Sequence, residues 1–261
     1  MSVFCISDIH GNLDALKKVL KKVAFKYDGS DQLFLLGDYI DWGPKPIETL
    51  QFIKEMDEDY HFVHVIYGNH EWLMEHYLDT CLIREENKSY FEFKDNIALA
   101  SWTTNKGIKS FNSFKKLSKE VQLQLYYYLK SLAKFKSLIV NGKRYYLTHS
   151  YPLESNYSKN EYDLFNNEKG IMVWKRVKAN TNVMKKLNNH LENYILVSGH
   201  TIVKAFNSID KDKKLKVYFD LQNQYINIDT GAKLIGYEDN YGYYGRLSII
   251  NLDNLQVTYS D

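Results

Sequence analysis

The chain has 261 residues, and 44% of them are hydrophobic, which is enough for a sizeable folded core and excludes a disordered chain. Its formal net charge is +2, so charge gives no reason to expect nucleic acid or a membrane as a partner. Two cysteines, Cys5 and Cys81, exclude a disulfide scaffold and a cysteine-based zinc module. Neither a signal-peptide pattern nor a run of 18 apolar residues occurs in the sequence, so we expect a cytoplasmic protein.

Strand and helix patterns alternate in the first third of the chain. Asn12 is typical of a residue that caps the start of a helix, and a helix pattern follows it. Such alternation is typical of parallel βαβ units. The predicted elements are, in order, strand 3–7, helix 13–23, strand 32–37, helix 46–56, strand 61–68 and helix 71–78.

The region 80–135 interrupts this alternation. It is polar and contains one clear helix pattern, at 118–132, so we expect a largely helical insertion or cap. Beyond it, Asn141-Gly142 separates two apolar runs and predicts a hairpin. We expect one α/β domain over residues 1–261 that carries this insertion. The later strands are predicted at 137–140, 144–149, 194–199, 215–220, 224–229 and 246–252.

Five of the predicted strands end in polar residues. In open α/β sheets, ligands bind beyond the carboxyl ends of the strands, so these side chains are expected to converge. Their oxygen and imidazole groups suit metal ions, and a pair of ions needs about this many ligands together with one bridging carboxylate. The expected ligands are Asp8, His10, Asp38, Asn69, His149 and His200.

These polar blocks resemble the signature of the calcineurin-like metallophosphoesterases, D-x-H…G-D-x-x-D…G-N-H-[DE]…H…G-H. The blocks occur in the same order between residues 8 and 200, and the stretch IDTGA at 228–232 extends the match. Within this superfamily the chain looks most like the bacterial and phage serine/threonine phosphatases and the symmetrical diadenosine tetraphosphate hydrolases. The resemblance implies a four-layer α-β-β-α sandwich.

The resemblance also implies how the metal ligands divide. Asp8 and His10 would bind the first ion, Asp38 would bridge both, and the second ion would be bound by Asn69, His149 and His200. This mixture of histidine and oxygen ligands suits Mn²⁺, Fe or Zn²⁺, and we expect Mn²⁺.

Three further residues acquire roles from the same resemblance. A hydroxide that bridges the metals would attack phosphorus in line, His70 would protonate the leaving oxygen, and Asp41 would orient His70. Arg176, in the stretch VWKR at 173–176, would hold the phosphate oxygens, and Asn69 would also lie against the substrate.

The sequence departs from the family pattern at two positions. Trp42 stands where relatives place an arginine that binds phosphate, and Tyr67 stands where they place lysine or arginine. Trp42 either packs at the rim of the site or stacks on an aromatic part of the substrate, and two aromatic replacements favour stacking.

The expected activity is hydrolysis of phosphomonoesters, with a phosphoserine or phosphothreonine protein or a small phosphate ester as the substrate partner. The alternative is a dinucleoside polyphosphate hydrolase with a nucleotide groove under the insertion. A nuclease is disfavoured, because Ile202 stands where many nucleases of the superfamily carry a second histidine. A catalytically silent binding module is disfavoured because the ligand set and His70 are present.

Overall fold

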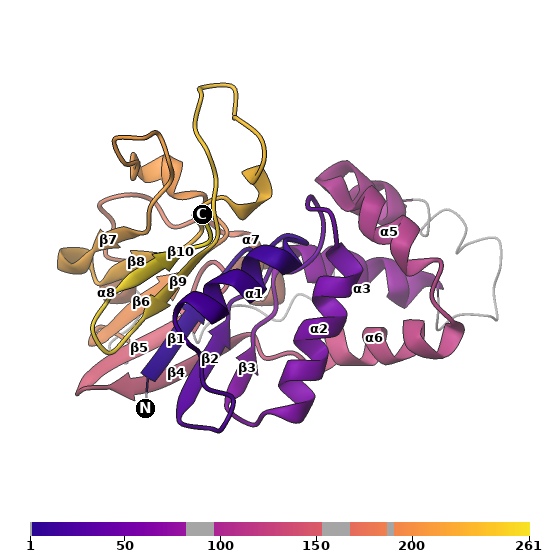
Figure 1. Ribbon diagram of the computed structural model, residues 1–261, viewed down its shortest axis with the longest axis horizontal. Helices are drawn as coiled ribbons and strands as arrows, with labels where there is room; N and C mark the ends of the chain where they lie inside the picture. Colours follow the sequence, from indigo (N-terminus) through magenta and orange to yellow (C-terminus); the bar gives the residue numbers. More distant parts are fainter. Residues whose placement is uncertain (1, 82–96, 153–167, 187–190) are drawn as a thin grey trace.

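The computed structural model describes residues 2–81, 97–152, 168–186 and 191–261, which form two five-stranded sheets (Figure 1). The first sheet has the strand order β10-β9-β1-β2-β3 and the second has the order β4-β5-β6-β8-β7. The strands of the first sheet are β1 (Ser2–Ile6), β2 (Asp31–Leu35), β3 (Val63–Val65), β9 (Ser248–Asn251) and β10 (Val257–Tyr259). Those of the second are β4 (Phe135–Val140), β5 (Lys143–Thr148), β6 (Tyr194–Ser198), β7 (Tyr218–Asp220) and β8 (Tyr225–Asn227).

The first sheet begins as the parallel βαβ arrangement that the sequence predicts. β1 pairs in parallel with β2, and β2 pairs in parallel with β3. The connecting helices are α1 (Leu13–Lys22) and α2 (Pro46–Asp59). β9 and β10 extend the sheet in antiparallel fashion, and β10 has no counterpart in the sequence-based prediction.

The second sheet opens with the predicted hairpin between β4 and β5. Asn141 and Gly142 both have positive φ angles, 48° and 77°, which is the backbone of the two-residue turn that Asn-Gly favours. β5, β6 and β8 then run parallel, and β7 is antiparallel to β8.

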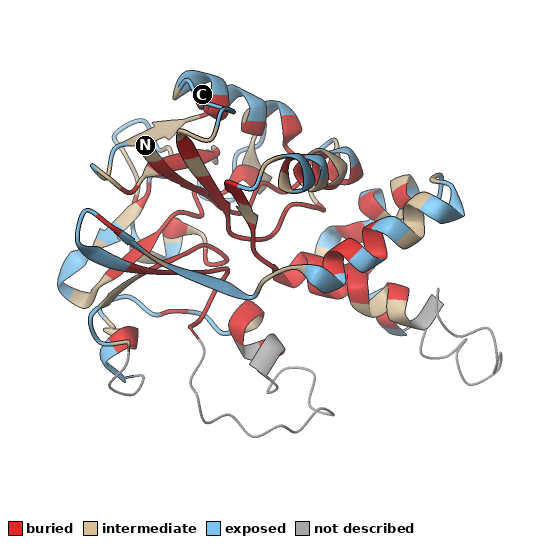
Figure 2. Cartoon of the chain, turned by 90° about the horizontal axis from the view of Figure 1, so that it is seen from below, coloured by how far each residue is buried: buried red, intermediate tan, exposed pale blue. Residues whose placement is uncertain are grey.

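The strand side chains alternate between two layers of core, and this alternation produces the four-layer sandwich. In β1, Phe4 and Ile6 belong to the core under the helices, whereas Val3 and Cys5 belong to the core between the sheets. In β5, Tyr146 faces away from the first sheet and packs in a third core that includes Met184 of α8 (Val183–Lys186). The exposed residues lie mainly on the outer helices and on the β4-β5 hairpin (Figure 2). The predicted α-β-β-α architecture is confirmed.

Two local predictions are wrong. The strand expected at 61–68 is only three residues long, because its pairing with β2 ends at Val65, and α3 (Asn69–Cys81) begins after residues 66–68. Asn12 precedes α1, but its side chain does not cap the helix. Its amide instead donates to the carbonyls of Ile9, His10 and Ala232, which joins the loop after β1 to the loop after β8.

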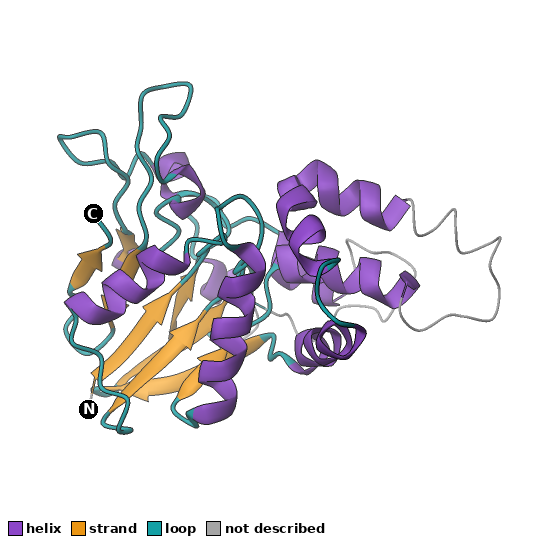
Figure 3. Ribbon diagram, turned by 45° about the vertical axis from the view of Figure 1, so that its right-hand side comes forward, coloured by secondary structure: helices purple, strands orange, loops and turns teal. Residues whose placement is uncertain are grey.

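The region of the predicted insertion contains several helices in its described part. Residues 97–102 are helical, a wider and kinked turn follows at Thr103–Gly107, and α5 (Ile108–Phe114) and α6 (Lys119–Ser131) come next. Figures 1 and 3 place α5 and α6 to one side of the sheets, where α5 contacts α2 and α6 contacts α3. Residues 82–96 of the predicted insertion lie outside the described residues. Its limits and the single-domain organisation stay predictions.

The remaining helical elements are short. They are α7 (Glu168–Trp174) and the single turns Val203–Phe206, Leu221–Asn223 and Ala232–Leu234. None of the helices in the described ranges has the length and apolar character needed to span a membrane.

Candidate active site

The predicted metal ligands converge around Asp38. One oxygen of its carboxylate lies 3.3 Å from Nε2 of His149, and the other lies 3.7 Å from Nε2 of His10 and 3.9 Å from Nε2 of His70. All of these side chains are buried. They come from the loops after β1, β2 and β5 and from the start of α3, so the strand ends meet as the sequence predicts.

The ligand atoms form two groups that share one carboxylate. His10, Asp38 and His70 present atoms within 4.8 Å of one another, and so do Asp38, His149 and His200. Asp38 is therefore in the position of a bridging ligand.

Asn69 joins the second of these groups. Its Oδ1 lies 2.9 Å from Nε2 of His149 and 2.8 Å from Nδ1 of His200. Three predicted ligands of the second metal therefore point to one spot.

Asp8 is placed differently from the other predicted ligands. One of its oxygens lies 3.9 Å from Nε2 of His10, but Asp8 is in neither of the two compact groups. Its carboxylate accepts the hydroxyl of Ser7 and the backbone N–H of His200. In the first group its place is taken by His70, for which the sequence predicts an acid's role, so Asp8 as a metal ligand stays a prediction.

The loops that carry these ligands have unusual backbone geometry. Asp8, His10, Asp38, Asp41 and His200 all have φ between 48° and 69°, a region that residues other than glycine rarely occupy. Such strain persists only where the surroundings hold the chain in place, and it clusters at functional sites.

Glu71 helps to keep these loops in place, although no role was predicted for it from the sequence. Its buried carboxylate accepts the backbone N–H groups of Asp38 and Tyr39 at 2.8 Å, and that of Gly68 at 3.1 Å. Burial and the nearby charge of Asp38 raise the pKa of Glu71 to about 8. The signal in the sequence was the acidic residue that ends the G-N-H-E block, since a carboxylate at the start of a helix is well placed to accept such bonds.

Three of the four histidines are oriented as metal ligands usually are. One ring nitrogen of each lies near a backbone carbonyl: Nδ1 of His10 is 3.1 Å from Ile40 O, Nδ1 of His149 is 2.8 Å from Leu36 O, and Nε2 of His200 is 3.2 Å from Trp174 O. This contact fixes the tautomer and turns the other nitrogen toward the cluster of predicted ligands, where those of His149 and His200 face Oδ1 of Asn69. Burial lowers the pKa of all three, so they are neutral imidazoles at neutral pH.

His70 has a carboxylate where the other three have a carbonyl. Its Nδ1 lies 2.6 Å from Oδ2 of Asp41. Burial alone would lower the pKa of His70, but the charge of Asp38 and the hydrogen bond to Asp41 outweigh burial and raise that pKa to about 9. The pKa of His70 is therefore shifted in the opposite direction from the pKa values of the other three histidines.

Asp41 receives two more side chains, which the sequence analysis missed. The indole N–H of Trp102 lies 3.1 Å from both of its carboxylate oxygens, and the hydroxyl of Ser110 donates to Oδ1. Both residues belong to the region of the predicted insertion. Their distance in sequence from Asp41 left no pattern that could have indicated them.

A polar cavity of about 170 Å³ opens onto this cluster. Arg176 lines it, as the predicted phosphate ligand should, and one of its N–H groups donates to the carbonyl of His200 at 3.1 Å. Two lysines, Lys106 and Lys233, line the same cavity and were not predicted. Three cationic side chains therefore surround the space in front of the metal ligands.

The two residues that depart from the family pattern, Tyr67 and Trp42, lie in different places. Tyr67 does not line the cavity: its ring lies in the core under the helices, and its hydroxyl donates to Glu75. The idea that both aromatic replacements point to stacking on the substrate is wrong for Tyr67, because its side chain is buried in the core and does not line the cavity.

Trp42 does line the cavity, and two lysines lie close to its ring. The Nζ atoms of Lys233 and Lys106 are 5.0 Å and 5.6 Å from the ring centroid, so they bring positive charge to the place where relatives carry an arginine. The indole N–H of Trp42 is buried and has no hydrogen-bond partner among the described residues. An oxygen of a bound ligand could accept this hydrogen bond.

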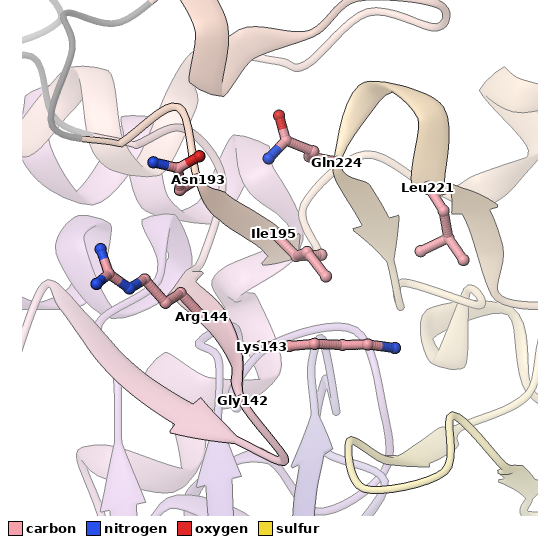
Figure 4. A pocket seen from close by; sticks show the side chains of 7 residues that line it. All are labelled: Gly142, Lys143, Arg144, Asn193, Ile195, Leu221 and Gln224. Carbon is pink, nitrogen blue, oxygen red and sulfur yellow. The ribbon is translucent and has the colours of Figure 1, made fainter.

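A second cavity, of about 560 Å³, lies at the other end of the second sheet, beside the start of β5 and β6. Its two cationic residues, Lys143 and Arg144, are neighbours in β5, and their side chains extend in opposite directions (Figure 4). Their charges do not converge on one spot, and the cavity is separate from the metal cluster.

Comparison with known proteins agrees with this geometry. Residues 1–219 match the model of the calcineurin-like phosphoesterase family. The chain belongs to this family. Members of it depend on a pair of metal ions, and the two ligand groups around Asp38 are where this phosphoesterase would hold them.

Curated relatives are symmetrical bis(5'-nucleosyl)-tetraphosphatases. The one from Vibrio parahaemolyticus is 33% identical over 105 residues, which are 39% of this chain and 38% of that protein. The one from Buchnera aphidicola is 41% identical over 71 residues, or 27% of this chain and 24% of that protein. The chain thus matches well under half the length of these relatives.

Solved structures share the fold over almost the whole chain. A putative diadenosine tetraphosphatase has a TM-score of 0.55 at 16% identity and covers 99% of this chain and 92% of its own. A protein serine/threonine phosphatase from Saccharomyces cerevisiae has a TM-score of 0.60 at 13% identity and covers 99% of this chain and 79% of its own. At these identities the likeness shows the fold alone.

Proposed function

We propose that this phosphoesterase hydrolyses phosphomonoesters, with phosphoserine or phosphothreonine proteins or small phosphate esters as substrates and Mn²⁺ as the metal. The observation that carries the proposal is the position of Asp38: one oxygen of its carboxylate faces His149, and the other faces His10 and His70. One carboxylate between two ion sites, next to a proton donor, is an arrangement suited to phosphoryl transfer.

The residues present fit a pair of divalent cations. Asp8, His10 and Asp38 would hold one ion, and Asp38, Asn69, His149 and His200 would hold the other. Burial and the charges of Asp229 and Asp38 raise the pKa of Asp8, as expected for carboxylates that lie close together in one buried site. Two bound cations would supply a water of lowered pKa as the nucleophile and would neutralise the phosphoryl oxygens.

The protein's own contribution to bond cleavage is a proton from His70. Its Nε2 faces Asp38 across 3.9 Å, while its Nδ1 is held by Asp41, so only Nε2 can reach a leaving oxygen. The pKa of about 9 keeps this nitrogen protonated at neutral pH, and nearby bound cations would lower that pKa toward the working pH. Asp41 then stabilises the imidazolium without taking the proton.

The cationic side chains hold the substrate. Arg176 offers a planar pair of donors for phosphate oxygens, and Lys233 and Lys106 add positive charge on the side where Trp42 replaces the usual arginine. This proposal leaves Trp42 free to contact the leaving group through its ring or its unpaired N–H.

A second candidate is hydrolysis of a dinucleoside polyphosphate. Two observations favour it: the curated relatives carry that name, and three cations in one cavity suit a substrate with several phosphates. The same metal ligands and the same His70 would serve.

One panel of assays tests both candidates. The purified protein is supplied with Mn²⁺ and assayed on p-nitrophenyl phosphate, a phosphoserine peptide and diadenosine tetraphosphate. Release of inorganic phosphate from the first two, abolished by chelator and restored by Mn²⁺, would support the phosphomonoesterase. Nucleotide release from the dinucleotide at a much higher kcat/KM would favour the second candidate, and no turnover of any substrate would refute both.

A further inference from the structure

The carboxylate of Asp41 is held by side chains from outside the sandwich. Asp41 is fully buried, and its carboxylate is bonded to His70, Trp102 and Ser110. Ser110 also accepts the backbone N–H of Asp41 at 3.0 Å, so it holds the main chain as well as the side chain. Two of the three partners come from residues 97–114, which lie beside the sheets rather than within them.

A regular helix could not bring Trp102 and Ser110 to the same carboxylate. Residues eight apart in an α-helix are displaced by about 12 Å along the axis and by about 80° around it. Here the helix is broken between them: Asn105 has ψ 27° and Lys106 has φ 72°, and the chain resumes as α5 in a new direction. The kink is therefore what allows both donors to reach Asp41.

Gly107 makes the kink compatible with the position of the indole. A Cβ atom at this residue would lie 2.3 Å from Cδ1 and 2.4 Å from Nε1 of Trp102, which is far closer than real contacts allow. The chain can pass over the face of Trp102 only because residue 107 has no side chain. The rings of Tyr77 and Phe111 also pack against this indole.

We propose that Trp102 and Ser110 are positioning residues: they fix Asp41, and through Asp41 they aim His70 at the leaving group. The inference rests on the proposed role of His70 as proton donor. Both donors bond the same carboxylate that is bonded to Nδ1 of His70, so they restrain the group that orients the imidazole. The proton-donating half of the site therefore depends on the helices beside the sandwich, whereas the metal-binding half does not.

The test is a leaving-group comparison. Trp102→Phe keeps the ring but removes the N–H, and Ser110→Ala removes the hydroxyl. We expect each to lower kcat/KM about 10- to 100-fold for a phosphoserine peptide, because its alkoxide leaving group needs a proton. This is the usual loss when a residue that orients a functional side chain is removed. For p-nitrophenyl phosphate, whose leaving group departs without a proton, the change should stay within about threefold because only acid catalysis is affected.

Phe111→Leu is the matched control, since Phe111 packs against the same indole but makes no polar contact with Asp41 among the described residues. It should leave the ratio of the two substrates unchanged. Equal loss on both substrates in Trp102→Phe and Ser110→Ala, no loss on either, or the same selective loss in Phe111→Leu would overturn the positioning role.

A measurement without substrate separates this inference from the proposed function. Proton NMR of the wild type should show a downfield imidazole N–H resonance, assigned to His70 by its disappearance in His70→Asn. Trp102→Phe and Ser110→Ala should shift or broaden it, and Phe111→Leu should not. A resonance that is unchanged in both variants refutes the positioning role, whereas a wild type that turns over no ester refutes the proposed function.

Discussion

The two sides of the candidate site are built in different ways. On the metal side, His10, His149 and His200 each have a backbone carbonyl as their outer partner, and these carbonyls belong to the loops and helix ends around the sheets. On the acid side, His70 has the carboxylate of Asp41, which is in turn held by side chains of the neighbouring helices. The first set of partners is part of the sandwich, and the second set is supplied from beside it.

This difference separates two functions that one cluster must combine. Burial and the charge of His70 lower the pKa of His10, whereas the charge of Asp38 and the bond to Asp41 raise the pKa of His70. The two shifts are opposite although the ring centroids are only 4.9 Å apart. Substitutions on the two sides should therefore have separable effects.

The largest effect is expected from the ligand that both metal groups share. Asp38→Asn should remove metal from the protein and lower kcat/KM on every substrate. The loss should exceed the roughly 100-fold loss that follows removal of a group that only hydrogen-bonds a metal ligand. Metal analysis and assays on two substrates check this. Asp14→Asn, an exposed residue that pairs with Lys45, is the control and should retain both metal and activity. Full metal content in Asp38→Asn would contradict the bridging position.

The next largest effect should be a loss of proton donation by His70, without a loss of metal. Asp41→Asn should lower kcat for a phosphoserine peptide by about 10²- to 10⁴-fold, the usual contribution of acid–base catalysis, because the His70 imidazolium loses its counter-charge. The metal content should remain that of the wild type, since among the described residues the carboxylate of Asp41 is bonded to His70, the proposed acid, and not to a proposed metal ligand. Loss of metal in this variant would show that the two sides are not separable.

A smaller effect should come from the substrate cations. Lys233→Met keeps most of the side-chain length and removes the charge, so it should raise KM for p-nitrophenyl phosphate about tenfold. This factor corresponds to the lower end of the free energy that a hydrogen bond to a charged group contributes. Both kcat and metal content should change little. Lys204→Met is a suitable comparison, because Lys204 pairs with Asp239 away from the cavity. An unchanged KM in Lys233→Met would exclude Lys233 from substrate binding.

The smallest effect is expected at the position that departs from the family. Trp42→Arg should change kcat/KM for p-nitrophenyl phosphate by less than about threefold, because Lys106 and Lys233 already supply positive charge beside this residue. The measurement is a direct comparison with the wild type at equal metal loading. A tenfold rise would mean that the lysines do not replace the missing arginine.

The sequence was most informative where function follows local order. Each ligand comes directly after a strand or at the start of a helix, so strand patterns and the identity of the next few residues were enough to predict which side chains meet. The Asn-Gly hairpin was readable for the same reason, because the turn depends on two adjacent residues. Boundaries were less certain: β3 is short because α3 takes over at Asn69.

Asn12 and Tyr67 show where local reasoning failed. Both were interpreted from their neighbours in sequence, as a helix cap and as part of the substrate site, and the side chains of both have other partners instead. Asn12 donates to Ala232, and Tyr67 donates to Glu75 from within the core. For a side chain with several possible hydrogen-bond partners, the partner that it bonds is decided only when the rest of the chain has folded around it.

By itself, the sequence determined the order of the strands' polar ends and the ligand types, because each of these depends on residues close together in the chain. The pairing of His70 with Asp41, 29 residues away, was implied by the resemblance to the family. Only the tertiary structure decided that Trp102 and Ser110 hold Asp41 and that Lys106 and Lys233 stand beside Trp42. These contacts join segments about 60 to 190 residues apart, and they exist because a kinked helix and the loop after β8 pack against the ends of the sheets. Such contacts cannot be predicted from the spacing of residues in the sequence, because they depend on how separate elements pack in space.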